Sequence, residues 1–89
     1  MTTIPAAVMR EAKSREFKAS VRIGKAGVTD TLIDEIRQQL ASRSLVKIKA
    51  NKGLIERDQR QAVWDFIAES TGGVLVLQRG NIGVLWRSQ

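Results

Sequence analysis

The chain has 89 residues, no cysteine and a formal net charge of +6 at pH 7. Its length is that of one small domain with a single core, and we expect one domain over residues 1–89. The 43% hydrophobic and 27% charged content excludes a disordered chain, and no apolar run approaches the ~20 residues of a membrane span. The first residues lack the pattern of a secretory signal, and the absence of cysteine excludes disulfides. We therefore expect a cytoplasmic protein.

The positive charge is concentrated in two blocks of the sequence. Residues 1–25 carry a net charge of +4 and residues 44–60 carry +3, whereas the segments 26–43 and 61–78 are net negative. This distribution predicts a one-sided potential and favours an anionic partner, namely nucleic acid, acidic lipid or an acidic protein. A basic surface that only confers solubility is the alternative.

The N-terminal half of the chain predicts a helix, a short strand and a second helix. The first helix is expected over residues 5–16 and the strand over residues 20–23. The second helix is expected over residues 30–42, where Thr29 or Asp30 can cap the free N–H groups of the first turn. One apolar stripe along this segment predicts its buried face: Val28, Leu32, Ile33, Ile36 and Leu40.

The next segments predict a strand and a third helix. Strand periodicity over residues 44–50 places Lys47 and Lys49 on the face opposite the apolar residues, and we expect that face to be solvated. The third helix is expected over residues 55–70, with Trp64 at the rim of its apolar face. That face is expected to comprise Gln59, Ala62, Val63, Phe66 and Ile67.

The C-terminal segment predicts a hairpin. Two apolar strands flank the turn residues Gly80 and Asn81, and Trp86 is expected to pack inward. The element order is therefore α-β-α-β-α-β-β. The first two strands flank a helix and should pair in parallel through a right-handed crossover, whereas the hairpin is antiparallel. The predicted fold class is α/β, a compact single domain with a mixed four-stranded sheet and three helices.

A G-x-x-G motif, formed by Gly24, Lys25, Ala26 and Gly27, separates the first strand from the second helix. A phosphate-binding P-loop is excluded, because alanine stands where that motif requires its first glycine and its Ser or Thr. A dinucleotide fingerprint is excluded as well, because one of its three glycines is missing. The remaining interpretations are a plain tight turn and a loop that clamps a nucleic-acid backbone, as in KH domains.

The residues that usually carry catalysis are scarce. The chain has no histidine and no cysteine, so it lacks an ordinary nucleophile–base pair and a zinc cluster. Two pairs of neighbouring carboxylates stand near predicted helix starts, where they compensate the helix dipole: Asp34 with Glu35, and Glu56 with Asp58. We therefore expect no enzymatic activity, no metal and no cofactor.

Three stretches of the sequence resemble the CRM domain, the chloroplast RNA splicing and ribosome maturation domain: IGKAGVTDTLIDEIRQQLASRSLVKIKA, ESTGG and VLVLQRGNIGVLWR. The resemblance spans residues 17–87. Before Phe17 the usual histidine is absent, and Ala19 stands where a proline is frequent. The resemblance implies a fold similar to the C-terminal domain of a bacterial translation initiation factor. It also implies a stand-alone YhbY-like RNA-binding protein associated with precursors of the large ribosomal subunit, whereas plant relatives assist group II intron splicing.

We therefore expect a non-catalytic, monomeric RNA-binding module that acts in ribosome assembly, on ribosomal precursor RNA in pre-ribosomal particles. Gly24, Ala26 and Gly27 would admit the RNA backbone, and Lys25 would pair with a phosphate. With two Phe, two Trp and no Tyr, contacts to phosphates and sugars should outnumber base contacts. The other predicted RNA-binding residues are Arg22, Lys47, Lys49 and Lys52, and the resemblance implies Arg87 as well, at the place of the family's terminal strand arginine. The alternatives are a protein-interaction module, which docks on a ribosomal protein or splicing factor, and a splicing helper.

Overall fold

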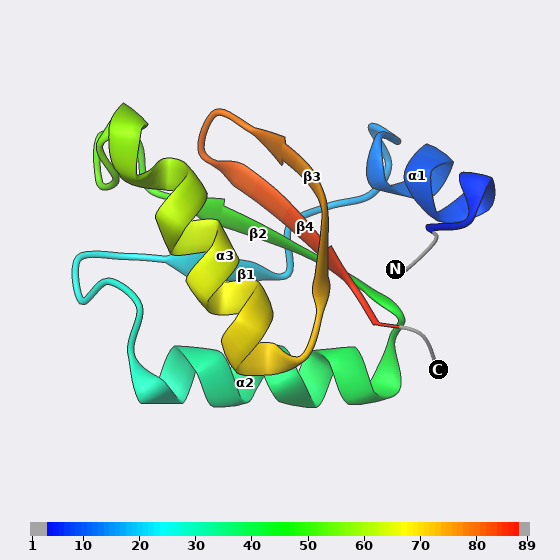
Figure 1. Ribbon diagram of the computed structural model, residues 1–89, viewed down its shortest axis with the longest axis horizontal. Coiled ribbons are helices and arrows are strands. Elements are labelled where there is room, and N and C mark those ends of the chain that lie inside the picture. Colours follow the sequence, from blue (N-terminus) through cyan, green and yellow to red (C-terminus); the bar gives the residue numbers. More distant parts are fainter. Residues whose placement is uncertain (1–3, 88–89) are drawn as a thin grey trace.

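A four-stranded sheet with helices on both faces organises the chain (Figure 1). The computed structural model describes residues 4–87; residues 1–3 and 88–89 of the predicted domain lie outside the described residues. The predicted element order is confirmed, but the first helix is shorter than expected and the third begins with a 3₁₀ turn. The elements are α1 (Ala6–Ala12), β1 (Val21–Ile23), α2 (Asp30–Ser42), β2 (Leu45–Ala50), η1 (Arg57–Gln59), α3 (Arg60–Thr71), β3 (Val74–Arg79) and β4 (Ile82–Trp86).

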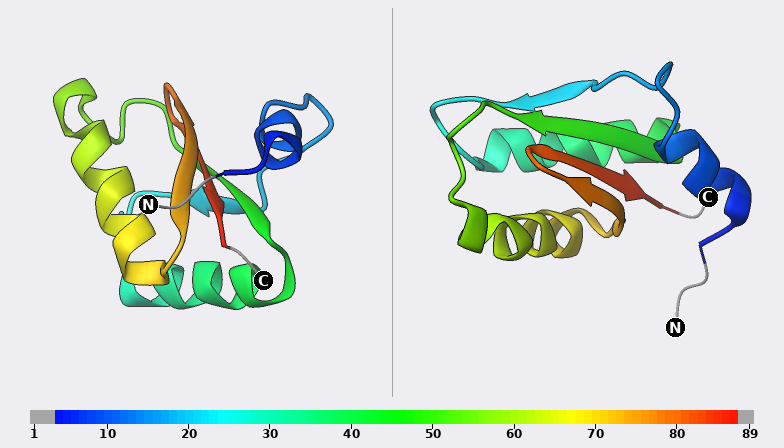
Figure 2. Two further views of the ribbon diagram at one scale, coloured as in Figure 1. Left: turned by 45° about the vertical axis from the view of Figure 1, so that its right-hand side comes forward. Right: turned by 90° about the horizontal axis from the view of Figure 1, so that it is seen from above.

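The sheet is mixed, as predicted, with the strand order β1-β2-β4-β3. Strands β1 and β2 are parallel, whereas β4 pairs antiparallel with both β2 and β3. Helices α2 and α3 cover one face of the sheet, and α1 lies on the other (Figure 2). We call the first the inner face and the second the outer face. Because side chains alternate along each strand, every strand contributes to both faces.

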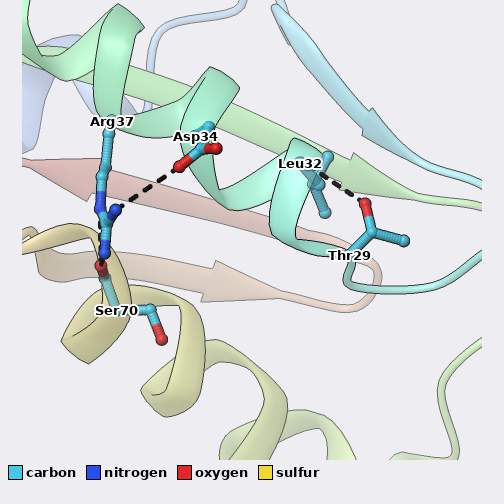
Figure 3. A network of polar contacts seen from close by, with 5 residues as sticks. All are labelled: Thr29, Leu32, Asp34, Arg37 and Ser70. Carbon is cyan, nitrogen blue, oxygen red and sulfur yellow. Dashed lines mark hydrogen bonds and ion pairs between the residues drawn. The ribbon is translucent and has the colours of Figure 1, made fainter.

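The main core lies between the inner face and the helices α2 and α3. The stripe predicted for the second helix is confirmed, since Leu32, Ile33, Ile36 and Leu40 are buried there. The same core takes in apolar residues of the strands: Val21, Ile23, Val46, Ile48, Ala50 and Leu85. At the start of α2, the Thr29 hydroxyl accepts a hydrogen bond of 3.1 Å from the Leu32 N–H (Figure 3), as its capping role predicts.

Arg37 links the two inner helices. Its guanidinium donates from Nε and NH2 to the Ser70 carbonyl at 3.0 and 2.8 Å, and it forms an ion pair with Asp34 at 3.5 Å (Figure 3). The last carbonyls of a helix have no intrahelical partner and carry its negative dipole end, so a cation is favourable there. Helix α3 then ends at Gly72, whose φ of 75° is the left-handed conformation that glycine adopts readily after a helix C-terminus.

The predicted apolar face of the third helix is correct for Ile67 and in part for Val63, but Gln59 and Ala62 are exposed, and Trp64 and Phe66 have exchanged their expected places. Trp64, expected at the rim, is 0% exposed, whereas Phe66, expected in the core, is 55% exposed. The cause is Gly83 in β4, because a Cβ at this glycine would lie 2.7 Å from a ring carbon of Trp64. Only a residue without a side chain leaves room for the indole against the sheet. The helix therefore turns Trp64, Ile67 and Thr71 inward.

The lysine-bearing face of the second strand is solvated at Lys49, as predicted, but the outer face as a whole is not open to solvent. A second apolar cluster lies there, formed by the buried residues Ala12, Leu45, Val84 and Trp86. Trp86 is buried as predicted, but in this cluster and not in the main core. The periodicity of the strands distinguishes two faces without showing that a helix from the start of the chain covers part of one of them. Ile4, Val8 and Phe17 add partly buried contacts to this cluster.

Replacement of Gly83 by alanine should lower the free energy of unfolding by about 1–3 kcal/mol, because the new methyl group collides with the buried Trp64 ring. Urea denaturation monitored by tryptophan fluorescence measures the change. Gly24→Ala is the matched control, since a Cβ there meets nothing within 4 Å. Equal stability of the two variants would show that Trp64 does not require this glycine.

Candidate nucleic-acid interface

The G-x-x-G motif forms a tight turn that projects from the end of β1. The Gly27 N–H donates to the Gly24 carbonyl at 2.9 Å, which places Lys25 and Ala26 at the exposed tip. Gly27 has a φ of 74°, a left-handed conformation that favours glycine. The loop lies at the left of Figure 1 and leads directly into α2.

Gly24 differs from Gly27, because nothing inside the protein requires a glycine there. Its φ lies outside the left-handed region, and a Cβ added to it would meet no atom within 4 Å. An alanine would therefore fit at this position in the free protein. The small residue leaves an open surface next to Lys25, where an external backbone can approach closely.

A second loop, which follows β2, carries Lys52 at the same end of the sheet as the G-x-x-G loop. Because β1 and β2 are parallel, the loops that follow them start at the same end of the two strands. The Asn51 N–H donates to the Ile23 carbonyl at 3.1 Å, which ties the start of this loop to the start of the G-x-x-G turn. Lys52 and Lys25 are both exposed. The structure thus places two predicted cations, from segments far apart in the sequence, on loops that leave the same end of the sheet.

Arg22 and Lys49 are neighbours on the outer face. They are register partners on β1 and β2, and the row continues through Ile82 of β4 to Arg79 of β3. The three cations of this row are exposed. A cross-strand row with three cations and no carboxylate gives this part of the outer face a positive potential.

Two adjoining cavities hollow the outer face, and their lining is strongly basic. The first, of about 270 Å³, is lined by Arg15, Phe17, Lys18, Ala19, Arg22, Lys47, Lys49 and Ile82. The second, of about 410 Å³, is lined by Ala12, Lys13, Ser14, Arg15, Lys47, Leu77, Arg79 and Ile82. They share Arg15, Lys47 and Ile82, and neither has an acidic residue in its lining. Together these cavities form what we call the basic groove.

Four cations of the basic groove are not among the predicted RNA-binding residues: Lys13, Arg15, Lys18 and Arg79. The first three were assigned to a helix over residues 5–16 or to the segment after it. In the structure α1 ends at Ala12, and the chain that follows lies beside the outer face. The charge excess of residues 1–25 was the available signal. It could not show where these side chains lie.

Lys47 has a structural role that the sequence did not indicate. Its Nζ donates to the Phe17 carbonyl at 2.9 Å and lies 5.9 Å from the centroid of the Phe17 ring, within range of a cation–π interaction. The side chain is half-buried. Lys47 therefore fastens the segment before β1 to the middle of the sheet and forms part of the groove wall.

Arg87 is not brought together with the other predicted residues. It follows β4, and its N–H donates to the Ser44 carbonyl at 2.9 Å, next to the start of β2. Lys52 and the G-x-x-G loop lie at the opposite end of β2. Arg87 is exposed, but it belongs to a different edge of the molecule.

The described part of the chain contains no group of three or more acidic residues that could hold a metal ion. None of the helices within residues 4–87 has the length and apolar character to cross a membrane.

Comparison with known structures confirms the fold. The solution structure of a hypothetical protein from Staphylococcus aureus, described as a candidate RNA-binding protein, matches with a TM-score of 0.75 at 21% sequence identity. The match covers 98% of this chain and 91% of that chain. The fold and the site together define the class of the protein: a small α/β domain with a basic groove and a G-x-x-G loop.

The sequence profile of the CRS1/YhbY (CRM) domain matches residues 7–87. The chain belongs to this family, which is an RNA-binding family. The predicted resemblance is confirmed, and it extends ten residues further toward the N-terminus than expected. A comparison with curated proteins finds no match.

Lys47→Met should reduce the free energy of unfolding by about 1 kcal/mol, because the hydrogen bond to the Phe17 carbonyl is lost. Lys49→Met removes an exposed lysine of the same strand and should change stability by less than about 0.5 kcal/mol. Urea titrations of both variants test this difference. If the two lysines proved equivalent, the fastening role of Lys47 would be wrong.

Proposed function

We propose that this protein is a non-catalytic RNA-binding protein that contacts RNA through the G-x-x-G loop and the adjacent basic surface. The observation that carries the proposal is the convergence of cations from separate segments on one edge and one face of the sheet. Lys25 and Lys52 lie on loops that leave the same end of the sheet, Arg22 and Lys49 are register partners on the outer face, and no carboxylate lines the basic groove. Membership in the CRM family supports RNA as the anionic partner.

In this proposal the loop receives the RNA backbone. Because Gly24 and Ala26 have no bulky side chains, a sugar-phosphate chain can approach the loop backbone closely, and Lys25 pairs with a phosphate. Helix α2 begins three residues after Gly27 and directs the positive end of its dipole toward the loop. Lys52 and Arg22 extend the contact on either side, and Lys47 and Lys49 continue it onto the outer face.

The RNA proposed is precursor RNA of the large ribosomal subunit, bound by the monomeric protein in pre-ribosomal particles in the cytoplasm. This part of the proposal is supported by the resemblance to YhbY-like proteins. Its physical basis is phosphate contact, which gives affinity and orientation but little base selectivity. The bound site must therefore be recognised largely by its shape.

A protein-docking role is the second candidate, and one observation favours it. Phe66 is 55% exposed and lies in a shallow apolar cavity of about 390 Å³ with Val28, Gln59, Ala62 and Val63. Phe66→Ser would abolish capture by a ribosomal protein or splicing factor without affecting RNA affinity. Binding of this kind would survive nuclease treatment.

Lys25→Ala should lower RNA affinity roughly twofold to fivefold, because one exposed phosphate pair is lost. The slope of log affinity against log salt concentration should fall by about 0.7 to 0.9. Fluorescence anisotropy with a labelled fragment of large-subunit ribosomal RNA, repeated over a salt series, measures both quantities. A salt slope near zero for the wild-type protein would exclude RNA binding through phosphates.

Substitutions at Gly24 test RNA affinity without a change in stability. Gly24→Ala should leave stability unchanged, since its Cβ meets nothing in the protein, and should still weaken RNA binding if a backbone lies against the loop. Gly24→Asp should weaken binding further, because it adds bulk and a negative charge. Unaltered affinity in Gly24→Asp would exclude this loop as the contact site.

A further inference from the structure

The basic groove contains an aromatic ring among its cations. Phe17 lines the first cavity together with Arg15, Lys18, Arg22 and Lys49. Its side chain is partly buried against the outer apolar cluster, and it keeps an exposed portion. A groove that combines cations along a backbone path with an aromatic stacking surface is typical of sites for single-stranded nucleic acid.

We propose that the basic groove holds a single-stranded segment of RNA, with one base stacked on Phe17 and the flanking phosphates bound by Arg15, Lys18 and Arg22. This inference rests on the RNA binding proposed above and adds the strandedness of the ligand. It also assigns contact roles to three residues, Arg15, Phe17 and Lys18, outside the G-x-x-G loop.

The cations of the basic groove are available for a ligand. Arg15, Lys18, Arg22 and Lys49 are exposed, and no acidic side chain lines the cavity. Among residues 4–87 the ion pair found is that of Arg37 with Asp34 on α2, on the inner side of the sheet. Like charges that face each other across neighbouring strands, as Arg22 and Lys49 do, repel each other, and a bound polyanion relieves this repulsion.

The Phe17 ring makes the basic groove selective for single-stranded over double-stranded RNA. In an RNA duplex the bases are stacked on one another, so a duplex offers phosphates and 2′-hydroxyls but no free base face. A single strand can turn a base out of its stack and place it on Phe17. The cations alone would accept either form, whereas Phe17 contributes only to the binding of a single strand.

The groove and the G-x-x-G loop can contact one continuous strand of RNA. Arg22 precedes Gly24 by two residues, which is about 7 Å along an extended backbone. Because β1 leads directly from the groove into the loop, phosphates bound at Arg22 and at Lys25 belong to neighbouring parts of the same chain. This continuity joins the two contact regions into one path.

The first test uses a fluorescein-labelled, unstructured 12-nucleotide RNA and the duplex formed with its complement. The wild-type protein should bind the single strand more tightly. Phe17→Leu, which keeps an apolar side chain for the outer cluster, should weaken single-strand binding roughly fivefold or more and leave duplex binding unchanged. Phe17→Trp should retain single-strand binding, and the RNA should quench its added indole fluorescence.

The second test compares two charge-matched double variants. Arg15→Ala with Lys18→Ala removes two groove cations, whereas Arg43→Ala with Arg57→Ala removes two exposed arginines that line neither cavity. The groove variant should lower the single-strand salt slope by about 1.4, twice the value of about 0.7 for one contact. The control variant should change affinity and slope less.

The outcomes separate this inference from the proposed function. The proposed function fails if the wild-type protein binds neither the single-stranded RNA nor the duplex and if the Lys25→Ala variant shows no difference from it. If binding depends on Lys25, but the duplex binds equally well and the groove variant matches its control, the groove proposal is overturned and RNA binding stands. Should Phe17→Leu unfold the protein, the double variants and Phe17→Trp still decide the question.

Discussion

The packing of Trp64 on Gly83 is the contact on which the arrangement of this domain depends. The indole is fully buried between α3 and the inner face, and no side chain larger than hydrogen fits beneath it. This contact fixes the rotation of α3 about its own axis. The same rotation exposes Phe66 and places Ser70 at the end of the helix within reach of Arg37.

The two faces of the sheet consequently differ in their physical role. The inner face is closed by α2 and α3 and contains the main apolar core. The outer face is covered only in part, by α1 and its small apolar cluster, and the remainder is lined by cations. Lys47 lies between the covered and the open part of the outer face. Its hydrogen bond to the Phe17 carbonyl holds the segment between α1 and β1 in place there.

Much of the fold could be predicted from local patterns. The stripe of α2, its Thr29 cap, the hairpin around Gly80 and the glycine stop at Gly72 all depend on residues within a few positions of each other. The face of α3 could not be predicted in this way. Both Trp64 and Phe66 are large and apolar, and which of them is buried depends on Gly83, about twenty positions away from Trp64.

The sequence by itself determined the element order, the family, the basic character and the position of the G-x-x-G turn, because each is carried by contiguous residues or by composition. Only the tertiary structure decided which cations share a surface. Arg15 and Lys18 join Arg22 and Lys49 because α1 ends at Ala12 and the following chain is fastened by Lys47. That arrangement results from contacts between residues up to 30 positions apart, which no local pattern encodes.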